Sequence, residues 1–181
     1  MTASAPRNAT ELNIMCDMKI RLFGTANDSI VDGPGLRYAV FTQGCPHNCE
    51  GCHNPNSHDM NGGYFEEIDS IMEKIRKNPL LDGVTLSGGE PFMQPAECAE
   101  IARRAHKMGL NVMVYTGFTF EELSENEQYM ELLKNTDILV DGKFVLAKKS
   151  IDLNFKGSSN QRIIDVPKSL ETGKTVISEY N

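Results

Sequence analysis

Short apolar runs rich in β-branched residues alternate along this chain with longer segments of helical spacing. The short runs predict strands at residues 19–23, 37–42, 83–86, 111–115, 138–140 and 162–166. From residue 65 to residue 77 the apolar positions recur at i, i+3, i+4 and i+7, at Ile68, Ile71, Met72 and Ile75. This second pattern predicts an amphipathic helix that ends before Pro79.

Two further helices are predicted in the second half of the chain. The first begins near Pro95, which a first helical turn accepts, and ends at Gly109. The second follows the capping-box pair Thr119 and Glu122 and runs through Leu133. Strands separated by helices of this length favour βαβ units and a mainly parallel sheet, whose ligands bind at the carboxyl ends of the strands.

Composition adds bounds on size and partners. The first 15 of the 181 residues are polar, and we expect them to form a loose arm. The rest of the sequence shows no change of composition that would divide it, so we expect a single domain over residues 16–181. With 18 Lys and Arg against 25 Asp and Glu, the net charge of −7 favours neither nucleic acid nor anionic lipid as a partner. Neither a spanning segment nor a secretory signal is evident. We expect a cytoplasmic protein without nucleic-acid or membrane partners.

Three of the five cysteines crowd into eight positions, as Cys45, Cys49 and Cys52, which indicates metal or redox chemistry better than a disulfide framework. A structural zinc site would need a fourth ligand, such as His47, His53, His58 or Cys98. A c-type haem would use the CEGCH segment and leave Cys45 unexplained. A [4Fe-4S] cluster held by three thiolates would keep one iron open for a small ligand. The residues favour the cluster and leave zinc and haem as alternatives.

A second candidate segment, Ser87-Gly88-Gly89-Glu90-Pro91, follows the predicted strand 83–86. Two glycines allow the backbone to approach a ligand closely, and Glu90 offers an acceptor for an ammonium group. The same residues are also good chemistry for a plain turn between a strand and a helix. By itself the segment therefore does not decide between a binding site and a turn.

Taken together, the Cys-x-x-x-Cys-x-x-Cys loop and the Gly-Gly-Glu segment resemble the radical S-adenosylmethionine superfamily. The segment DGPGLR at residues 32–37 and the loop ending Cys52-His53-Asn54 resemble its glycyl-radical-enzyme activases. DILVDGKF at residues 137–144 and KGSSNQRIID at residues 156–165 are similar to those activases whose partner is anaerobic ribonucleoside-triphosphate reductase. The resemblance covers about residues 19–166.

That resemblance implies an α/β fold, specifically a shortened, open (β/α) barrel of the radical S-adenosylmethionine type with mainly parallel strands. It implies an oxidoreductase that cleaves S-adenosylmethionine at a [4Fe-4S] cluster and places a glycyl radical on the reductase. A reductant such as flavodoxin or ferredoxin would supply the electron, and the chain would form a homodimer or a complex with the reductase. The alternatives are an activase of pyruvate formate-lyase, a non-catalytic iron-sulfur electron carrier and a zinc module.

The resemblance also assigns residues. Cys45, Cys49 and Cys52 would ligate the cluster, and no catalytic side chain is expected beyond the cluster and cofactor. The cofactor would lie against two short segments: Gly51, Cys52 and His53 beside the adenine, and Gly88, Gly89 and Glu90 near the methionine amino group. Many superfamily members have an aromatic residue where this chain has Gly51, so the adenine must stack elsewhere, for which the His53 ring is a candidate.

Four further residues lie outside the cluster and cofactor assignments. Arg37 could position a partner's loop or simply belong to a turn. Asp141 could contact the cofactor or pair with Lys143. Cys16 and Cys98 match no motif, and Cys98 is expected to be a small buried hydrophobe in its predicted helix.

Overall fold

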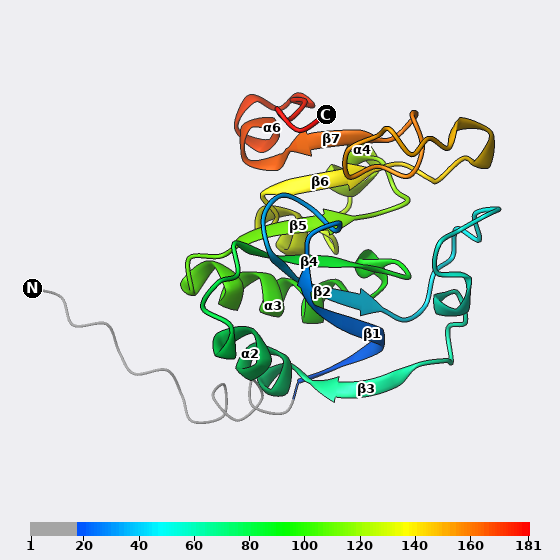
Figure 1. Ribbon diagram of the computed structural model, residues 1–181. Coiled ribbons are helices and arrows are strands. Elements are labelled where there is room, and N and C mark those ends of the chain that lie inside the picture. Colours follow the sequence, from blue (N-terminus) through cyan, green and yellow to red (C-terminus); the bar gives the residue numbers. More distant parts are fainter. Residues whose placement is uncertain (1–17) are drawn as a thin grey trace, which may run out of the picture.

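One open sheet runs through residues 18–181, the part of the chain that the computed structural model describes (Figure 1). Its strand order is β3-β1-β2-β4-β5-β6-β7. The strands are β1 (Lys19–Ser29), β2 (Arg37–Thr42), β3 (Tyr64–Glu67), β4 (Gly83–Gly88), β5 (Asn111–Tyr115), β6 (Ile138–Asp141) and β7 (Arg162–Asp165). The predicted N-terminal arm and Cys16 lie outside the described residues.

The four central strands β2, β4, β5 and β6 run parallel, whereas β1 and β7 are antiparallel to the neighbours they pair with. This confirms an α/β fold with a parallel centre. The barrel is not confirmed, because β3 and β7 stand at opposite ends of the described strand order and leave the sheet open.

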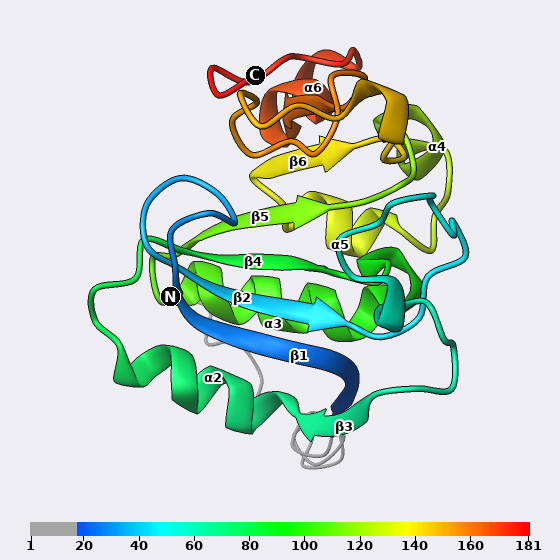
Figure 2. The same cartoon turned by 45° about the vertical axis from the view of Figure 1, so that its right-hand side comes forward.

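Five helices accompany the strands in residues 18–181: α2 (Ile68–Lys77), α3 (Pro95–Lys107), α4 (Phe120–Ser124), α5 (Met130–Lys134) and α6 (Val166–Thr172). Helix α3 contacts both α2 and α5, and α5 contacts α6, so these helices form one layer over the sheet (Figure 2). Single 3-10 turns occur at η1 (Pro55–Ser57), η2 (Pro91–Met93) and η3 (Leu146–Lys148). None of the helices in residues 18–181 has the length and apolarity to cross a membrane.

The two faces of the sheet bury different sets of side chains, because neighbouring residues of a strand point to opposite faces. The face under the helices carries the larger core, which includes Val40, Leu86 and Val114 together with Ile71 and Ile101 from the helices. The opposite face carries a small cluster of Met113, Ile138, Val140 and Ile163, with Tyr115 and Phe155 packed against it. Cys98 is fully buried in the larger core, which confirms its expected role as a small hydrophobe.

Two predicted helix boundaries are wrong. The helix expected from residue 65 begins at Ile68, because Tyr64–Glu67 pair with β1 as strand β3, where Phe65 lies opposite Arg21. The helix expected from Thr119 through Leu133 is two short helices. Its capping box is present, but the Asn126 side chain accepts a hydrogen bond from the Gln128 amide. Such a local side-chain bond competes with helix continuation.

The carboxyl ends of the parallel strands lie at one edge of the molecule, beside the loop after β2 and the segment of residues 142–161 (Figures 1 and 2). Phe41 pairs with Ser87, and Leu86 pairs with Val114 on the next strand. Phe41, Ser87 and Tyr115 therefore lie side by side near the carboxyl ends of their strands, on the face away from the helices. The cysteine loop, the Gly-Gly-Glu segment and the segment after β6 meet at this edge, as expected for ligand sites in parallel sheets, whereas Arg37 and the turn before it lie at the amino end of β2.

Candidate cluster and cofactor site

The loop after β2, here called the cluster loop (residues 43–58), brings the three clustered cysteines to one cavity. Its two ends are joined by hydrogen bonds from the Gly44 amide to the Ser57 carbonyl at 2.8 Å and from the Cys45 amide to the His58 carbonyl at 3.2 Å. Cys45, Cys49 and Cys52 are free thiols of intermediate exposure. All three line a cavity of about 130 Å³, together with Gly88 and Gly89 of the second motif.

The sulfur atoms of this loop lie among local donors. Burial raises the pKa of the Cys45 thiol, and backbone hydrogen bonds from His47 and Asn48 act in the opposite direction. The Asn54 amide donates to Cys52 Sγ at 3.4 Å. Amide donors of this kind stabilise a thiolate and tune the potential of an iron-sulfur centre. No three His, Cys, Asp or Glu side chains in residues 18–181 converge closely enough to hold a single metal ion, but three thiols on one cavity, with backbone donors close by, suit a cluster whose separate irons each take one thiolate.

The histidines named as zinc ligands have other partners. The His47 ring pairs with Glu90 at 2.8 Å, and His58 Nδ1 lies 3.2 Å from the Asn48 side-chain oxygen. His53 lies next to Phe144, with ring centroids 5.7 Å apart. Cys98 is buried in α3, inside the larger core. The surroundings therefore favour three thiolates over a four-ligand zinc site.

Glu90 is fully buried and accepts four hydrogen bonds. Oε2 lies 2.8 Å from His47 Nε2 and accepts from the Gly117 amide at 2.9 Å. Oε1 accepts from the Thr116 hydroxyl at 2.9 Å and from the Phe92 amide at 3.1 Å. The carboxylate thus joins the end of β4, the turn after β5 and the cluster loop.

A second cavity, of about 320 Å³, adjoins the first at the carboxyl ends of the strands. Cys52, Ser87, Tyr115, Phe144 and Gln161 line both cavities. The walls of the second cavity are aromatic to a large extent, with Phe41, His53, Tyr115, Phe144 and Phe155. Its volume and its mixture of aromatic and polar groups are typical of small-molecule sites.

The backbone at Gly51 explains why no aromatic residue precedes Cys52. Gly51 has a φ of +72°, a conformation that side chains disfavour. A Cβ atom there would also lie 2.8 Å from Leu146 Cδ1. Residues of the segment after β6, namely Leu146 and Phe144, thus occupy the space beside the third cysteine.

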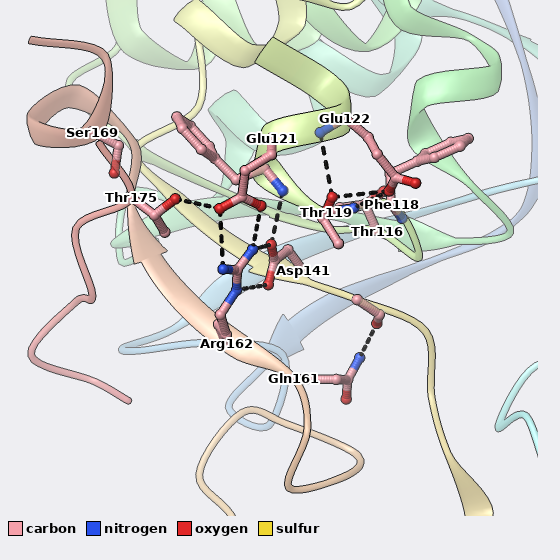
Figure 3. A network of polar contacts seen from close by, with 12 residues as sticks. Thr116, Phe118, Thr119, Glu121, Glu122, Asp141, Gln161, Arg162, Ser169 and Thr175 are labelled. Atoms are coloured by element: carbon pink, nitrogen blue, oxygen red, sulfur yellow. Dashed lines mark hydrogen bonds and ion pairs between the residues drawn. The ribbon is translucent and has the colours of Figure 1, made fainter. Parts of the chain in front are cut away.

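Asp141 pairs with Arg162, so of its two interpretations the one in which it pairs with Lys143 is wrong (Figure 3). Arg162 donates to the buried Asp141 carboxylate and to Glu121, and Asp141 also accepts from the Phe120 amide. These residues connect β6, β7 and α4, next to the points where the segment of residues 142–161 leaves and rejoins the sheet. The pair therefore secures the segment that supplies Phe144 to both cavities.

This network predicts a stability change at low pH. The Arg162 guanidinium lowers the pKa of the half-exposed Glu121 carboxyl to about 2, so the native state holds its proton more weakly than the unfolded chain. The resulting stabilisation, about 0.5 kcal/mol after solvent screening, is present above about pH 5 and is lost as the pH falls toward 2. Urea unfolding at several pH values should show that Glu121→Gln loses less stability than the wild type as the pH falls over this range. Parallel curves for the two proteins would contradict the assignment.

Arg37 is buried, and no carboxylate of residues 18–181 pairs with it. Its guanidinium donates to the Thr85 hydroxyl at 2.6 Å, to the Val84 carbonyl at 2.7 Å and to the Pro34 carbonyl at 3.0 Å. Burial lowers its pKa to about 10. These contacts show that Arg37 holds the loop between β1 and β2 against β4, which agrees with the turn interpretation.

The sequence interpretation missed three residues that shape this site. From the sequence alone, His47 is only a candidate zinc ligand, Arg162 only a strand residue and Phe144 only part of a motif. Their partners are Glu90, Asp141 and His53, which lie far from them in the sequence. The signal that could have found His47 is its position between two of the clustered cysteines.

Comparisons with known proteins agree with this geometry. The family described as "4Fe-4S single cluster domain" matches residues 31–164, which include the cluster loop. The chain is 37% identical over 143 residues to the anaerobic ribonucleoside-triphosphate reductase-activating protein of Escherichia coli K12, covering 73% of this chain and 90% of that protein. The protein of the same name from Vibrio cholerae is 34% identical, covering 74% and 90%.

More distant similarities are consistent with these. The pyruvate formate-lyase-activating enzyme of Clostridium pasteurianum is 36% identical over 132 residues, which span 69% of this chain and 53% of that enzyme. The crystal structure of QueE from Escherichia coli has a TM-score of 0.51 at 15% identity, over 62% of this chain and 58% of QueE, and supports the α/β fold. On the extent and identity of these matches, the chain belongs to the family of anaerobic ribonucleoside-triphosphate reductase-activating proteins.

Proposed function

We propose that this protein activates anaerobic ribonucleoside-triphosphate reductase by generating a glycyl radical on it. The observation that carries the proposal is the convergence of Cys45, Cys49 and Cys52 on one cavity that opens onto an aromatic cavity at the carboxyl ends of the strands. An electron carrier has no need of this second cavity. A radical activase needs it to hold S-adenosylmethionine beside the open iron.

The three thiolates would hold a [4Fe-4S] cluster. When bound there, the cluster would supply the electron for reductive cleavage of S-adenosylmethionine, the chemistry that yields methionine and the 5′-deoxyadenosyl radical required to form a glycyl radical on the partner. The protein supplies orientation, shielding from water and tuning of the potential. A flavodoxin or ferredoxin would serve as the reductant, in the cytoplasm, and the activase would work as a homodimer or bound to the reductase.

The remaining site residues would hold the methionine part of the cofactor in one cavity and its adenine in the other. Gly88 and Gly89 line the cysteine cavity, where their backbone can lie against the methionine moiety, with Glu90 completing the same segment. The adenine would lie in the aromatic cavity, flanked by Gly51, Cys52 and His53. Because Gly51 supplies no ring, the neighbouring rings of His53 and Phe144, which are tilted by 44° to one another, are the stacking partners we propose.

The proposed function is tested by anaerobic reconstitution with iron and sulfide, followed by reduction and incubation with S-adenosylmethionine. We expect 5′-deoxyadenosine by chromatography, and a glycyl radical by electron paramagnetic resonance (EPR) only when the reductase is present. A glycyl radical formed on pyruvate formate-lyase instead would favour the second candidate, which the similarity to the Clostridium enzyme supports. If the reduced cluster does not cleave S-adenosylmethionine, the activase function is refuted and the electron-carrier alternative remains.

A further inference from the structure

The middle of the cluster loop is attached to the sheet through one histidine. His47 lies midway between Cys45 and Cys49 and bonds to Glu90, 43 positions away. In the described chain, the other hydrogen bonds of residues 46–52 stay within residues 45–58. Gly44, next to Cys45, is hydrogen-bonded directly to the Glu90 amide at 2.8 Å, so it is the loop beyond this point, including Cys49, whose position relative to the sheet depends on where the His47 side chain is held.

The structure provides a closely fitting slot for this ring. The His47 side chain is only 7% exposed. It meets the Phe118 ring edge to face, with centroids 4.6 Å apart and an interplanar angle of 74°. A Cβ atom at Gly117 would overlap the imidazole, so the turn after β5 leaves room for the ring only because residue 117 is glycine. Packing and the hydrogen bond to Glu90 together fix the ring.

Glu90 is suited to hold this ring because four donors converge on it. An ionised carboxylate only accepts hydrogen bonds and has about four acceptor sites, so it can satisfy all four donors. A glutamine of the same shape would turn an amino group toward donors and leave polar groups unpaired. With its acceptor sites occupied and its side chain absent from the lining of both cavities, the Glu90 carboxylate is poorly placed to bind an ammonium group itself.

We propose that His47 and Glu90 are positioning residues, which anchor the cluster loop to the ends of β4 and β5 so that Cys45 and Cys49 face the same cavity as Cys52. The part of this inference that concerns the cluster rests on the proposed function. The part that concerns the loop does not, because the His47–Glu90 contact forms from side chains of the protein alone.

The test compares three variants by hydrogen exchange of the protein before iron is added. His47→Phe keeps a ring against Phe118 but removes the donor, whereas His47→Gln can still donate through its side-chain nitrogen. The matched control is His106→Phe, because His106 also contacts a distant carboxylate, that of Asp137 at 2.9 Å, but lies at the end of α3. We expect exchange over residues 44–54 to be about tenfold faster in His47→Phe, close to wild type in His47→Gln and unchanged in His106→Phe.

The same variants are then reconstituted, reduced and examined by EPR with and without S-adenosylmethionine. His47→Phe should lose the spectral change that the cofactor causes in the wild type, and His47→Gln should restore it. Unchanged exchange and spectra in His47→Phe would overturn the inference while leaving the function intact. If the wild type never cleaves S-adenosylmethionine but His47→Phe still speeds exchange, the function fails and the loop anchor stands. Should His47→Phe not fold, the nearly isosteric Glu90→Gln must give the faster exchange, and wild-type exchange there would refute the anchor.

Discussion

Replacing Cys49 by alanine should abolish both cofactor cleavage and glycyl radical formation. Cys49 is one of three thiols on a single cavity, and two thiolates cannot hold a [4Fe-4S] cluster there. We expect the reconstituted Cys49→Ala protein to lose the iron-sulfur absorption and to yield no 5′-deoxyadenosine above background. Iron and sulfide analysis, EPR of the reduced protein and chromatography of the reaction mixture measure these losses separately.

Cys98→Ala is the matched control for this loss. Cys98 is fully buried in α3, and burial raises the pKa of its thiol well above the usual value, so it is an inert part of the core. Its truncation should lower stability by about 1 kcal/mol and leave cluster content and cleavage unchanged. Cleavage that survives in Cys49→Ala would refute the ligand assignment. Iron loss in Cys98→Ala would bring this cysteine into the ligand set.

The central strands could be predicted from the sequence because they are buried on both faces. Runs such as GVTL and NVMVY need no partner to be recognised, and they became β4 and β5 close to the expected bounds. Strand β3 could not be predicted in this way. Its residues Tyr64 and Phe65 are exposed apolar side chains that continue the helical pattern of α2, and only pairing with β1 makes them a strand.

The openness of the sheet also required the structure. The alternation of strands and helices is the same for an open sheet and for a barrel, since both are built from βαβ units. What separates them is whether the two edge strands meet. Here the edges are β3, paired only with β1, and β7, which returns antiparallel to β6 in the described sheet. Neither of these edge pairings can be predicted from the local pattern of residues.

For the candidate site, too, local features could be predicted from the sequence and contacts between distant residues could not. The three cysteines could be predicted because they are neighbours in the sequence and share one chemistry. The contact between His47 and Glu90 could not, because it joins residues 43 positions apart in the sequence. Glu90 illustrates this: its type and its place after β4 suggested an acceptor, while its actual donors come from the cluster loop, the turn after β5 and its own turn. Which donors reach Glu90 depends on how the cluster loop and the two turns pack around its buried side chain.

Gly89→Ala should disrupt the contact between the two motifs of the site. A Cβ atom at Gly89 would overlap the Gly44 carbonyl oxygen and lie 2.9 Å from the carbonyl carbon. Both groups belong to backbone that is already tied, by bonds from the Gly89 amide to Thr42 at 2.7 Å and from the Glu90 amide to Gly44 at 2.8 Å. We expect a loss of about 2–4 kcal/mol, which corresponds to a melting temperature about 5–15 °C lower by calorimetry.

Gly24→Ala isolates the cause, because Gly24, like Gly89, lacks the left-handed φ but has no atom within 4 Å of its added Cβ. Its melting temperature should equal or slightly exceed that of the wild type. The overlap at Gly89 also predicts a functional loss: the start of the cluster loop must move away from β4, so cofactor cleavage should fall even where the protein remains folded. Equal melting temperatures and equal cleavage for the two variants would mean that the Gly89–Gly44 approach is not needed. A loss confined to Gly89→Ala would establish that backbone contact between the glycine segment and the cluster loop sets the geometry of the site.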